Sequence, residues 1–175
     1  MNNPKIFGVT GWKNSGKTTM ICKLIEEFVK RGYKVASVKH AHHNFDVDHE
    51  GTDSHSHRMA GAGEVAVTSS KRWAIMHELA DSDEPTLAEM LEKLSPCDII
   101  LIEGYKKEFH PKIETIRMEF RRDKAIWKED ESVVAIATDA SEPDCQLPQF
   151  SQEAITDIAD MIADTVKLGK SNVRN

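Results

Sequence analysis

Short apolar runs alternate with a longer segment of helical periodicity over the first forty residues of the chain. Lys5–Thr10 is a short run of β-branched and aromatic residues, which predicts a buried strand. From Lys17 to Arg31 the apolar positions recur on one helical face, and Gly32 stands where a helix C-terminus favours a left-handed residue. Val35–Lys39 predicts a second strand. This β–α–β order predicts a right-handed crossover between parallel strands, and so an α/β layered fold.

The later part of the chain predicts more strands and helices of the same layered fold. Ile99–Ile102 is a continuous apolar run, typical of a central parallel strand. Thr86-Leu-Ala-Glu89 is a capping box that begins an amphipathic helix. The other predicted elements are a short helix from Asp53 or Ser54, a hairpin of Glu64–Ser69 with Trp73–Glu78, strands at Lys112–Arg117 and Val133–Ala137, and a last helix from Ile155 to Val166.

Composition narrows the class of protein. The 175 residues are 39% hydrophobic and 30% charged, and no repeat or linker divides them, so we expect one domain over residues 1–170 with a frayed tail at 171–175. The net charge of -6 argues against a protein that coats nucleic acid or an anionic membrane. Three widely spaced cysteines form no disulfide framework or CxxC zinc site. Without a long apolar run or a signal peptide, we predict a cytoplasmic protein.

A glycine-containing loop separates the first predicted strand from the first predicted helix. Its sequence, Gly11-Trp12-Lys13-Asn14-Ser15-Gly16-Lys17-Thr18, followed by Thr19, satisfies the pattern G-x-x-x-x-G-K-[ST]. Such a loop points successive backbone N–H groups into one concavity that a phosphate fills, and the helix N-terminus adds partial positive charge. Lys17 would reach the β- and γ-phosphates, and Thr18 would ligate Mg²⁺. We therefore predict nucleotide binding and a P-loop NTPase-like three-layer α/β fold, with a mostly parallel central sheet and an added β-hairpin.

A second carboxylate is expected at the end of another central strand. Glu103 follows the apolar run from Asp98, although an aspartate is more usual there. Glu103 would hold Mg²⁺, directly or through water, or orient an attacking water as a general base; the alternative is a solvated acid at a strand end. Gly104 permits close approach of backbone to a ligand. Lys106 would contact a phosphate or extend into solvent.

Six of the eight histidines fall within eighteen residues, from His40 to His57, and Asp46, Asp48 and Asp53 lie among them. Imidazole and carboxylate together suit zinc or nickel, but no pair has HxxxH spacing and no cysteine is near, so a solvated loop beside the phosphate site is the other interpretation. Asp53 is the best candidate for a magnesium-linked role, against a plain helix N-cap.

Weaker candidates lie elsewhere in the chain. Asp139 follows the strand ending at Ala137, where many P-loop proteins read the base; an aspartate there can accept two hydrogen bonds from guanine, although no N-K-x-D motif is present. The alternative for Asp139 is a turn residue. The arginines Arg117, Arg121 and Arg122 would contact phosphate or a partner, but a charged edge is the commoner explanation. For Trp73 we favour a core position over a partner surface.

Taken together, these motifs resemble the MobB family of molybdopterin-guanine dinucleotide biosynthesis adaptor proteins. The resemblance spans roughly residues 5 to 140 and rests on several short blocks in the family's order. The blocks are Gly11–Thr19, Val38–His43, Asp46–Asp48, Gly51–Ser54, Arg58–Ala62, Arg72–Met76 and Ile102–Lys106.

The resemblance implies more than the spacing of the motifs does. Members of the family are P-loop proteins that bind GTP, dimerise, and associate with the guanylyltransferase MobA, which attaches GMP to molybdopterin. They are thought to help deliver GTP or the finished cofactor to molybdoenzymes, with feeble hydrolysis of their own. Carried over to this chain, the phosphate cradle is Trp12 to Thr19, the metal candidates are Thr18, Asp53 and Glu103, and the hairpin of Glu64–Glu78 is a candidate dimer contact.

Two other functions share the same phosphate cradle. A small-molecule kinase would transfer the γ-phosphoryl group, but it usually needs a lid bearing several arginines, and Arg117 to Arg122 follow a strand instead. A metallochaperone GTPase would load nickel or zinc through the His40–His57 segment. We favour the GTP-binding adaptor, at most a slow GTPase, because no arginine finger is evident.

Overall fold

The computed structural model describes residues 4–41, 45–120 and 124–169. The chain divides into two compact units: unit 1 comprises residues 1–40 and 90–175, and unit 2 comprises residues 41–89. The division falls within helix α3 (Leu87–Glu92), whose capping box is formed as predicted. The single domain over residues 1–170 stays a prediction, and its tail at 171–175 lies outside the described residues.

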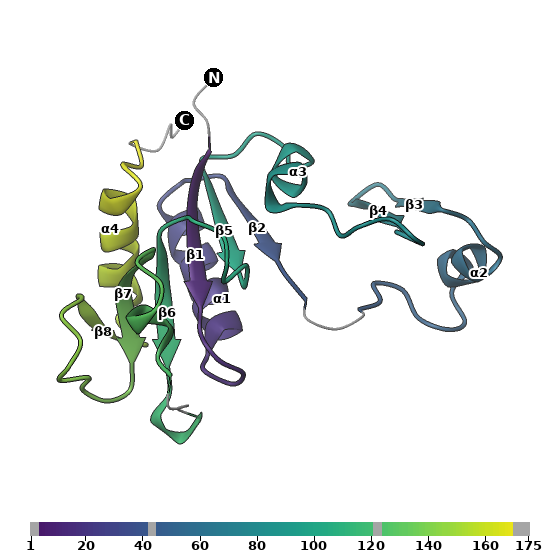
Figure 1. Cartoon of the computed structure of the whole chain (residues 1–175). Coiled ribbons are helices and arrows are strands. Elements are labelled where there is room, and N and C mark those ends of the chain that lie inside the picture. Colours follow the sequence, from purple (N-terminus) through teal and green to yellow (C-terminus); the bar gives the residue numbers. More distant parts are fainter. Residues whose placement is uncertain (1–3, 42–44, 121–123, 170–175) are drawn as a thin grey trace. The chain divides into compact units, whose positions relative to one another are not determined.

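Unit 1 is built on a six-stranded sheet in which every neighbouring pair is parallel. The strands, in spatial order, are β2 (Val35–Lys39), β5 (Ile99–Glu103), β1 (Lys5–Thr10), β6 (Lys112–Ile116), β7 (Val133–Thr138) and β8 (Gln149–Ser151). Five of these strands were predicted, and β8 was not. Because all six run the same way, their carboxyl ends meet at one edge of the sheet, where open α/β sheets bind ligands (Figure 1).

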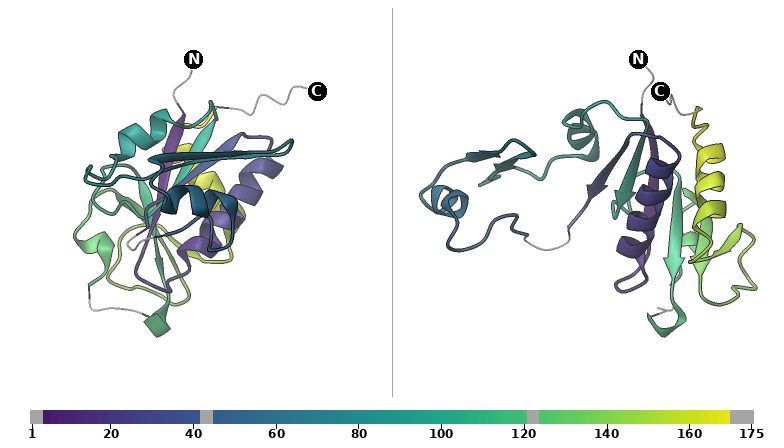
Figure 2. Two further views of the ribbon diagram at one scale, coloured as in Figure 1. Left: turned by 90° about the vertical axis from the view of Figure 1, so that its right-hand side faces the viewer. Right: turned by 180° about the vertical axis from the view of Figure 1, so that it is seen from behind.

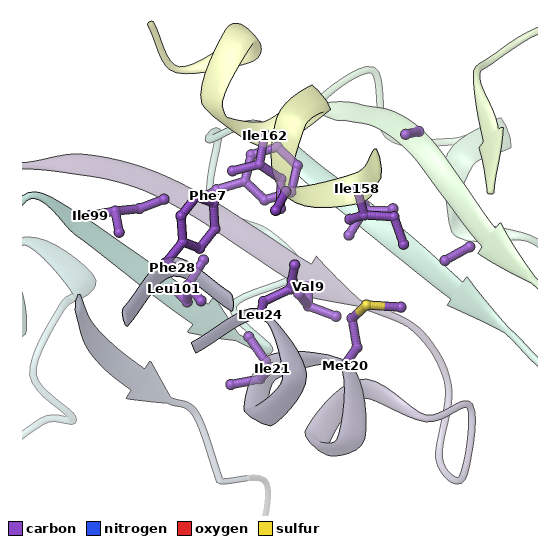
Figure 3. Packing of buried hydrophobic residues seen from close by; sticks show 14 residues of the cluster. Phe7, Val9, Met20, Ile21, Leu24, Phe28, Ile99, Leu101, Ile158 and Ile162 are labelled. Atoms are coloured by element: carbon purple, nitrogen blue, oxygen red, sulfur yellow. The ribbon is translucent and has the colours of Figure 1, made fainter. Parts of the chain in front are cut away.

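One face of this sheet is covered by two helices, α1 (Lys17–Lys30) and α4 (Ile155–Thr165), which lie side by side (Figure 2). Leu24 and Phe28 of α1 and Ile162 of α4 are fully buried against the sheet, because the apolar positions of both helices recur every three or four residues (Figure 3). The predicted α/β fold class is therefore confirmed.

Helix α1 ends in the way its sequence predicts. Gly32 has φ +85°, its N–H donates to the carbonyl of Val29, and the Tyr33 N–H donates to the carbonyl of Phe28. This pair of bonds is a Schellman motif, which satisfies the last carbonyls of a helix. The Phe28 and Tyr33 rings pack edge to face, with 6.0 Å between the ring centres. This pair adds the apolar contact that usually accompanies the motif.

The opposite face of the sheet is covered differently. Ile116 and Ile136 pack with Cys145, Trp127 and Leu147, from the 3-10 turn η2 (Ile126–Lys128) and the segment before β8. A second 3-10 turn, η1 (Met118–Phe120), follows β6. Within the described residues, no helix has both the length and the apolar character needed to span a membrane.

A buried lysine ties two loops of unit 1 to β6. Lys112 is fully buried, and its ammonium donates to the carbonyls of Lys106 (3.3 Å) and Glu108 (2.7 Å) and to Asp130 Oδ2 (3.1 Å). Burial alone would raise the pKa of the Asp130 carboxyl, but hydrogen bonds from Ser132 and Lys112 hold that pKa below its ordinary value. The Lys112 ammonium therefore joins the loop after β5 to Asp130.

Unit 2 consists of helix α2 (Asp53–Met59) and the antiparallel hairpin of β3 (Glu64–Thr68) and β4 (Trp73–His77). The N-cap of α2 is Thr52, whose hydroxyl accepts from the His55 N–H, so the plain N-cap interpretation of Asp53 is wrong. Asp53 is instead the first residue of the helix.

An arginine organises the loop before α2. The Arg58 guanidinium donates to Asp48 (2.6 Å), Asp46 (3.0 Å) and Glu78 (2.9 Å). The hydrogen bond from Arg58 lowers the pKa of the Asp48 carboxyl. Two carboxylates of the histidine-rich segment are thus bound to an arginine inside unit 2.

Trp73 lies on the surface and not in the core as predicted. The tryptophan is 70% exposed and its neighbour on the same face of the hairpin, Ile75, is 57% exposed, whereas Val65 on the other face is 6% exposed. Helix α2 contacts β3. A two-stranded sheet packed on one side leaves the residues of its second face without cover, which alternation in the sequence alone does not reveal.

We predict that Lys112→Met lowers the free energy of unfolding by about 2–4 kcal/mol, because it leaves two carbonyls and a carboxylate without their cation. Urea denaturation at pH 7 measures this. In the wild type, the lowered pKa of Asp130 contributes stability that is present above the ordinary carboxyl pKa and is lost as the pH falls. Stability of the variant should accordingly fall less steeply on acidification.

The control is Lys124→Met, which removes an exposed ion pair with Glu129 and should change stability by less than about 1 kcal/mol. If Lys112→Met were no more destabilising than this control, the buried ammonium would not hold the loop.

Candidate functional site

The loop between β1 and α1 has an unusual backbone. Gly11 (φ +147°), Asn14 (φ +66°) and Gly16 (φ +99°) all have positive φ within six residues, a conformation that turns successive N–H groups into one concavity. A Cβ on Gly11 would lie 2.6 Å from the Thr115 carbonyl oxygen, so only glycine fits. Gly16 is the N-cap of α1, and no side chain caps the helix, which leaves its first N–H groups open to an anion.

Two hydroxyls fasten this loop to the neighbouring strand β6. Ser15 Oγ lies 2.8 Å from Thr115 Oγ1, and Thr115 Oγ1 donates to the carbonyl of Thr10 at 3.1 Å. Since the Thr115 hydroxyl has one proton, Ser15 is the donor to Thr115. Ser15 and Thr115 are both buried, so these bonds hold the loop while its outer residues Lys13 and Asn14 stay exposed.

Lys17 folds back over the loop at the start of α1. Its ammonium donates to the carbonyl of Trp12 at 2.8 Å. Burial lowers the pKa of Lys17, the Glu103 carboxylate opposes that shift, and Lys106 and Lys39 add to it. A phosphate beside Lys17 would stabilise its charged form, so the site favours an anion at this position.

Thr18 connects the loop to the carboxyl end of β5. Its hydroxyl donates to the two oxygens of Glu103, at 3.0 Å and 3.2 Å, and Lys39 of β2 lies 3.6 Å from Glu103 Oε1. Glu103 is only 8% exposed. Two of the three predicted metal ligands, Thr18 and Glu103, are therefore in contact. Thr19, which follows the motif, is an exposed residue of α1.

This pair fits a divalent cation. The proton of the Thr18 hydroxyl is directed to Glu103, so its oxygen lone pairs remain available to a metal. Hydroxyl and carboxylate oxygens are the hard ligands that Mg²⁺ prefers. Mg²⁺ between these groups and a phosphate would neutralise the charge of the phosphate.

The residues after Glu103 take the conformation that a close approach requires. Gly104 has φ +92°, and a Cβ there would lie 3.1 Å from the Cβ of His40. The Lys106 ammonium lies 4.1 Å from the centre of the Trp12 ring, so it packs over that ring and does not simply extend into solvent. Its contact with a phosphate stays a prediction. Trp12 also donates through Nε1 to the Lys124 carbonyl at 2.8 Å.

The residue that directly follows each of β6, β7 and β8 lies at the same edge of the sheet. These residues are Arg117, Asp139 and Gln152. Asp139 is exposed, and its carboxylate accepts from the Met118 N–H at 3.0 Å. Arg117 does not belong to a charged edge as expected: it is half-buried, and its Nη2 lies 3.2 Å from the position of a Cβ on Gly16. Arg121 and Arg122 lie outside the described residues.

Gln152 was not identified from the sequence. It donates to the carbonyls of Ser15 and Ile116 and accepts from Arg117 Nε. Its only signal would have been its place at the carboxyl end of a strand, but β8 itself is three residues long and was missed.

A separate metal cluster is not found in the part of the chain that the structure describes, where no group of three or more histidine, cysteine, aspartate or glutamate side chains could hold an ion. His42 and His43 lie outside that part. Asp53 belongs to unit 2, whereas Thr18 and Glu103 belong to unit 1. The role of Asp53 as a metal ligand stays a prediction.

Comparison with known proteins agrees with this site. The model of the family MobB, "Molybdopterin guanine dinucleotide synthesis protein B", matches residues 6–139. The chain is 41% identical over 143 residues to a molybdopterin-guanine dinucleotide biosynthesis adapter protein of Haemophilus influenzae, covering 79% of this chain and 77% of that protein. It is 37% identical over 136 residues to the adapter protein of that name from Escherichia coli, covering 77% and 78%.

A solved structure shares the fold. The structure of Bacillus subtilis MobB matches with a TM-score of 0.72 and 25% identity, covering 93% of this chain and 98% of that one. The P-loop, the parallel sheet and the family match all describe a nucleotide-binding protein. The chain belongs to the MobB family of molybdopterin-guanine dinucleotide biosynthesis adapter proteins.

Proposed function

We propose that this protein is a Mg-GTP-binding adapter that assists the guanylyltransferase MobA in forming or delivering molybdopterin-guanine dinucleotide to molybdoenzymes. The observation that carries the proposal is the phosphate loop itself, with Lys17 over it and with Thr18 bonded to Glu103 at 3.0 Å. The proposed pathway comes from the related proteins, which are named molybdopterin-guanine dinucleotide biosynthesis adapter proteins. The base preference for GTP follows from the family resemblance.

Different residues of the chain would bind the phosphates, the metal and the base of the nucleotide. The N–H groups of residues 12–19 and the Lys17 ammonium would bind the phosphate oxygens, and the Thr18 hydroxyl with Glu103 would hold Mg²⁺. Asp139, at the end of β7, is the proposed guanine contact, because an aspartate can accept from the two N–H groups on one edge of that base. Asp53 is retained as a further metal candidate.

Hydrolysis is proposed to be slow. Glu103 could orient a water, but its carboxylate is already engaged by Thr18 and Lys39. Arg117, the described arginine beside the loop, is engaged by Gln152. Efficient hydrolysis usually requires an arginine that stabilises the transition-state charge, and its absence costs about 10³–10⁵ in rate. An adapter that presents a nucleotide would gain nothing from rapid turnover.

We also propose a homodimer formed through the hairpin of β3 and β4. Trp73 and Ile75 are exposed on one face of the hairpin, and Met59 of α2 is 71% exposed. Tryptophan and methionine are enriched at protein interfaces relative to the rest of the protein surface. A small unit with so little buried apolar surface gains stability when a partner covers it.

The nucleotide-binding proposal is tested with Lys17→Ala. We expect this variant to bind Mg-GTP at least about a hundredfold more weakly, because charge-assisted hydrogen bonds to phosphate are each worth about 1.5–3 kcal/mol. Isothermal titration calorimetry measures the dissociation constant, and circular dichroism checks the fold.

Lys30→Ala is the matched control: it makes the same change of charge at the other end of α1, where Lys30 is exposed. An unchanged dissociation constant for Lys17→Ala would contradict the proposed role of the loop.

For the dimer, we expect Trp73→Glu to raise the dimer dissociation constant at least about tenfold, since it introduces a charge into the proposed contact and removes a large aromatic anchor. Sedimentation velocity at micromolar concentration distinguishes monomer from dimer. Phe109→Glu serves as the control, because Phe109 is 88% exposed in unit 1 and outside the hairpin. The proposed dimer would be contradicted if the wild type were a monomer. It would also be contradicted if the dimer dissociation constant of Trp73→Glu equalled that of the wild type.

A further inference from the structure

Gln152 connects the phosphate loop to the sheet. It follows β8 directly and precedes α4, and it is half-buried. Its amide nitrogen donates to the carbonyls of Ser15 (3.1 Å) and Ile116 (2.9 Å), with the Ala137 carbonyl at 3.5 Å. Three carbonyls from the phosphate loop, β6 and β7 thus converge on one side chain.

The contact with Ser15 fixes the orientation of a peptide group. The described peptide bonds are trans, so the carbonyl of Ser15 and the N–H of Gly16 point in opposite directions. Because the Ser15 carbonyl faces Gln152, the Gly16 N–H points away from Gln152. Gly16 is the N-cap of α1, so that N–H belongs to the open helix terminus where an anion would be held.

The amide oxygen of Gln152 completes the arrangement. It accepts from Arg117 Nε at 3.2 Å, and it would lie 2.8 Å from a Cβ on Gly16. The side chain therefore packs tightly against the loop as well as bonding to it. Neither Gln152 nor Arg117 has been placed in the phosphate cradle, so a role for Gln152 acts through the loop.

We infer that Gln152 is a positioning residue of the nucleotide site: it holds the Ser15–Gly16 peptide so that the Gly16 N–H faces the phosphate. The inference rests on the proposed nucleotide binding and names the residue that orders the loop for it. Without Gln152 the Ser15 carbonyl loses its partner and the peptide is less restrained, so part of its ordering must occur when the phosphate binds and weakens that binding.

The test compares two substitutions with a matched control. Gln152→Leu removes the hydrogen bonds, and Gln152→Glu keeps the shape while it replaces the donor with an oxygen that faces three carbonyls. Gln149→Leu is the control: its amide likewise donates to two carbonyls, of Glu142 and Cys145, but these belong to the segment before β8.

The probes are Mg-GTP and Mg-tripolyphosphate, which has no base or ribose. We expect Gln152→Leu to bind both probes about tenfold more weakly, the scale of one hydrogen bond lost at a buried carbonyl. Gln152→Glu should bind both probes at least as weakly, because it also adds a negative charge beside the loop. Gln149→Leu, which also loses two donated hydrogen bonds, should lower the melting temperature of the free protein and leave both dissociation constants within about twofold of the wild type.

Several results would overturn the inference. Unchanged affinity for both probes in the two Gln152 variants would do so. A loss for Mg-GTP alone would instead assign Gln152 to the base or ribose, and an equal loss in Gln149→Leu would show a general effect of stability. Failure of the wild-type chain to bind either probe would instead refute the nucleotide-binding proposal itself, and this inference with it.

Discussion

The backbone of the loop between β1 and α1 is the constraint on which unit 1 depends. Positive φ angles at Gly11, Asn14 and Gly16 are needed to turn the N–H groups inward, and the Trp12 carbonyl accepts from the Ser15 N–H and from the Lys17 ammonium within the loop. Its neighbours supply further stability. Ser15 bonds to Thr115 on β6, and Thr18 bonds to Glu103 on β5.

The parallel sheet explains why these contacts can form. β1 is flanked by β5 and β6, so the loop that leaves β1 emerges between the carboxyl ends of both strands. Helix α1 packs its apolar face on the sheet and fixes the other end of the loop. The apolar core and the polar site are thus consequences of the same strand order.

Periodicity and motif spacing predicted much of this arrangement. The strand Lys5–Thr10, the helix from Lys17 and the left-handed Gly32 each carry a local signal, and each is confirmed. Glu103 was predicted because an acid after a buried parallel strand must emerge at the ligand edge, and it lies there. These features depend on near neighbours in the sequence or on strand direction.

Other features depend on tertiary packing and could not be predicted in that way. Trp73 has a sequence context that suits a core strand, but the described structure leaves its face of a two-stranded sheet exposed. Gln152 and Thr115 contact the loop from 137 and 100 residues away, in segments with no motif. In the sequence, Lys112 is simply a charged residue of a predicted strand. In the structure it is fully buried, because loop carbonyls and Asp130 surround its ammonium.

Unit 2 is stabilised by different interactions from those of unit 1. Its buried hydrophobic residues, within the described part, are Val65 and Leu87, so apolar packing contributes little. Arg58 compensates by binding three carboxylates, which explains why Asp46 and Asp48 precede the helix that carries the arginine. Unit 2 is therefore held largely by polar contacts, and it leaves the tryptophan of its hairpin exposed.

The most direct test is a crystal structure of the protein with Mn²⁺ in place of Mg²⁺ and a non-hydrolysable GTP analogue, with the metal located by its anomalous scattering. We predict that the metal binds Thr18 Oγ1 at about 2.0–2.3 Å, that the Thr18–Glu103 hydrogen bond persists, and that the β-phosphate lies on the N–H groups of the loop. A nucleotide bound elsewhere, or a metal held by histidines of residues 40–57 and remote from Thr18, would contradict the account.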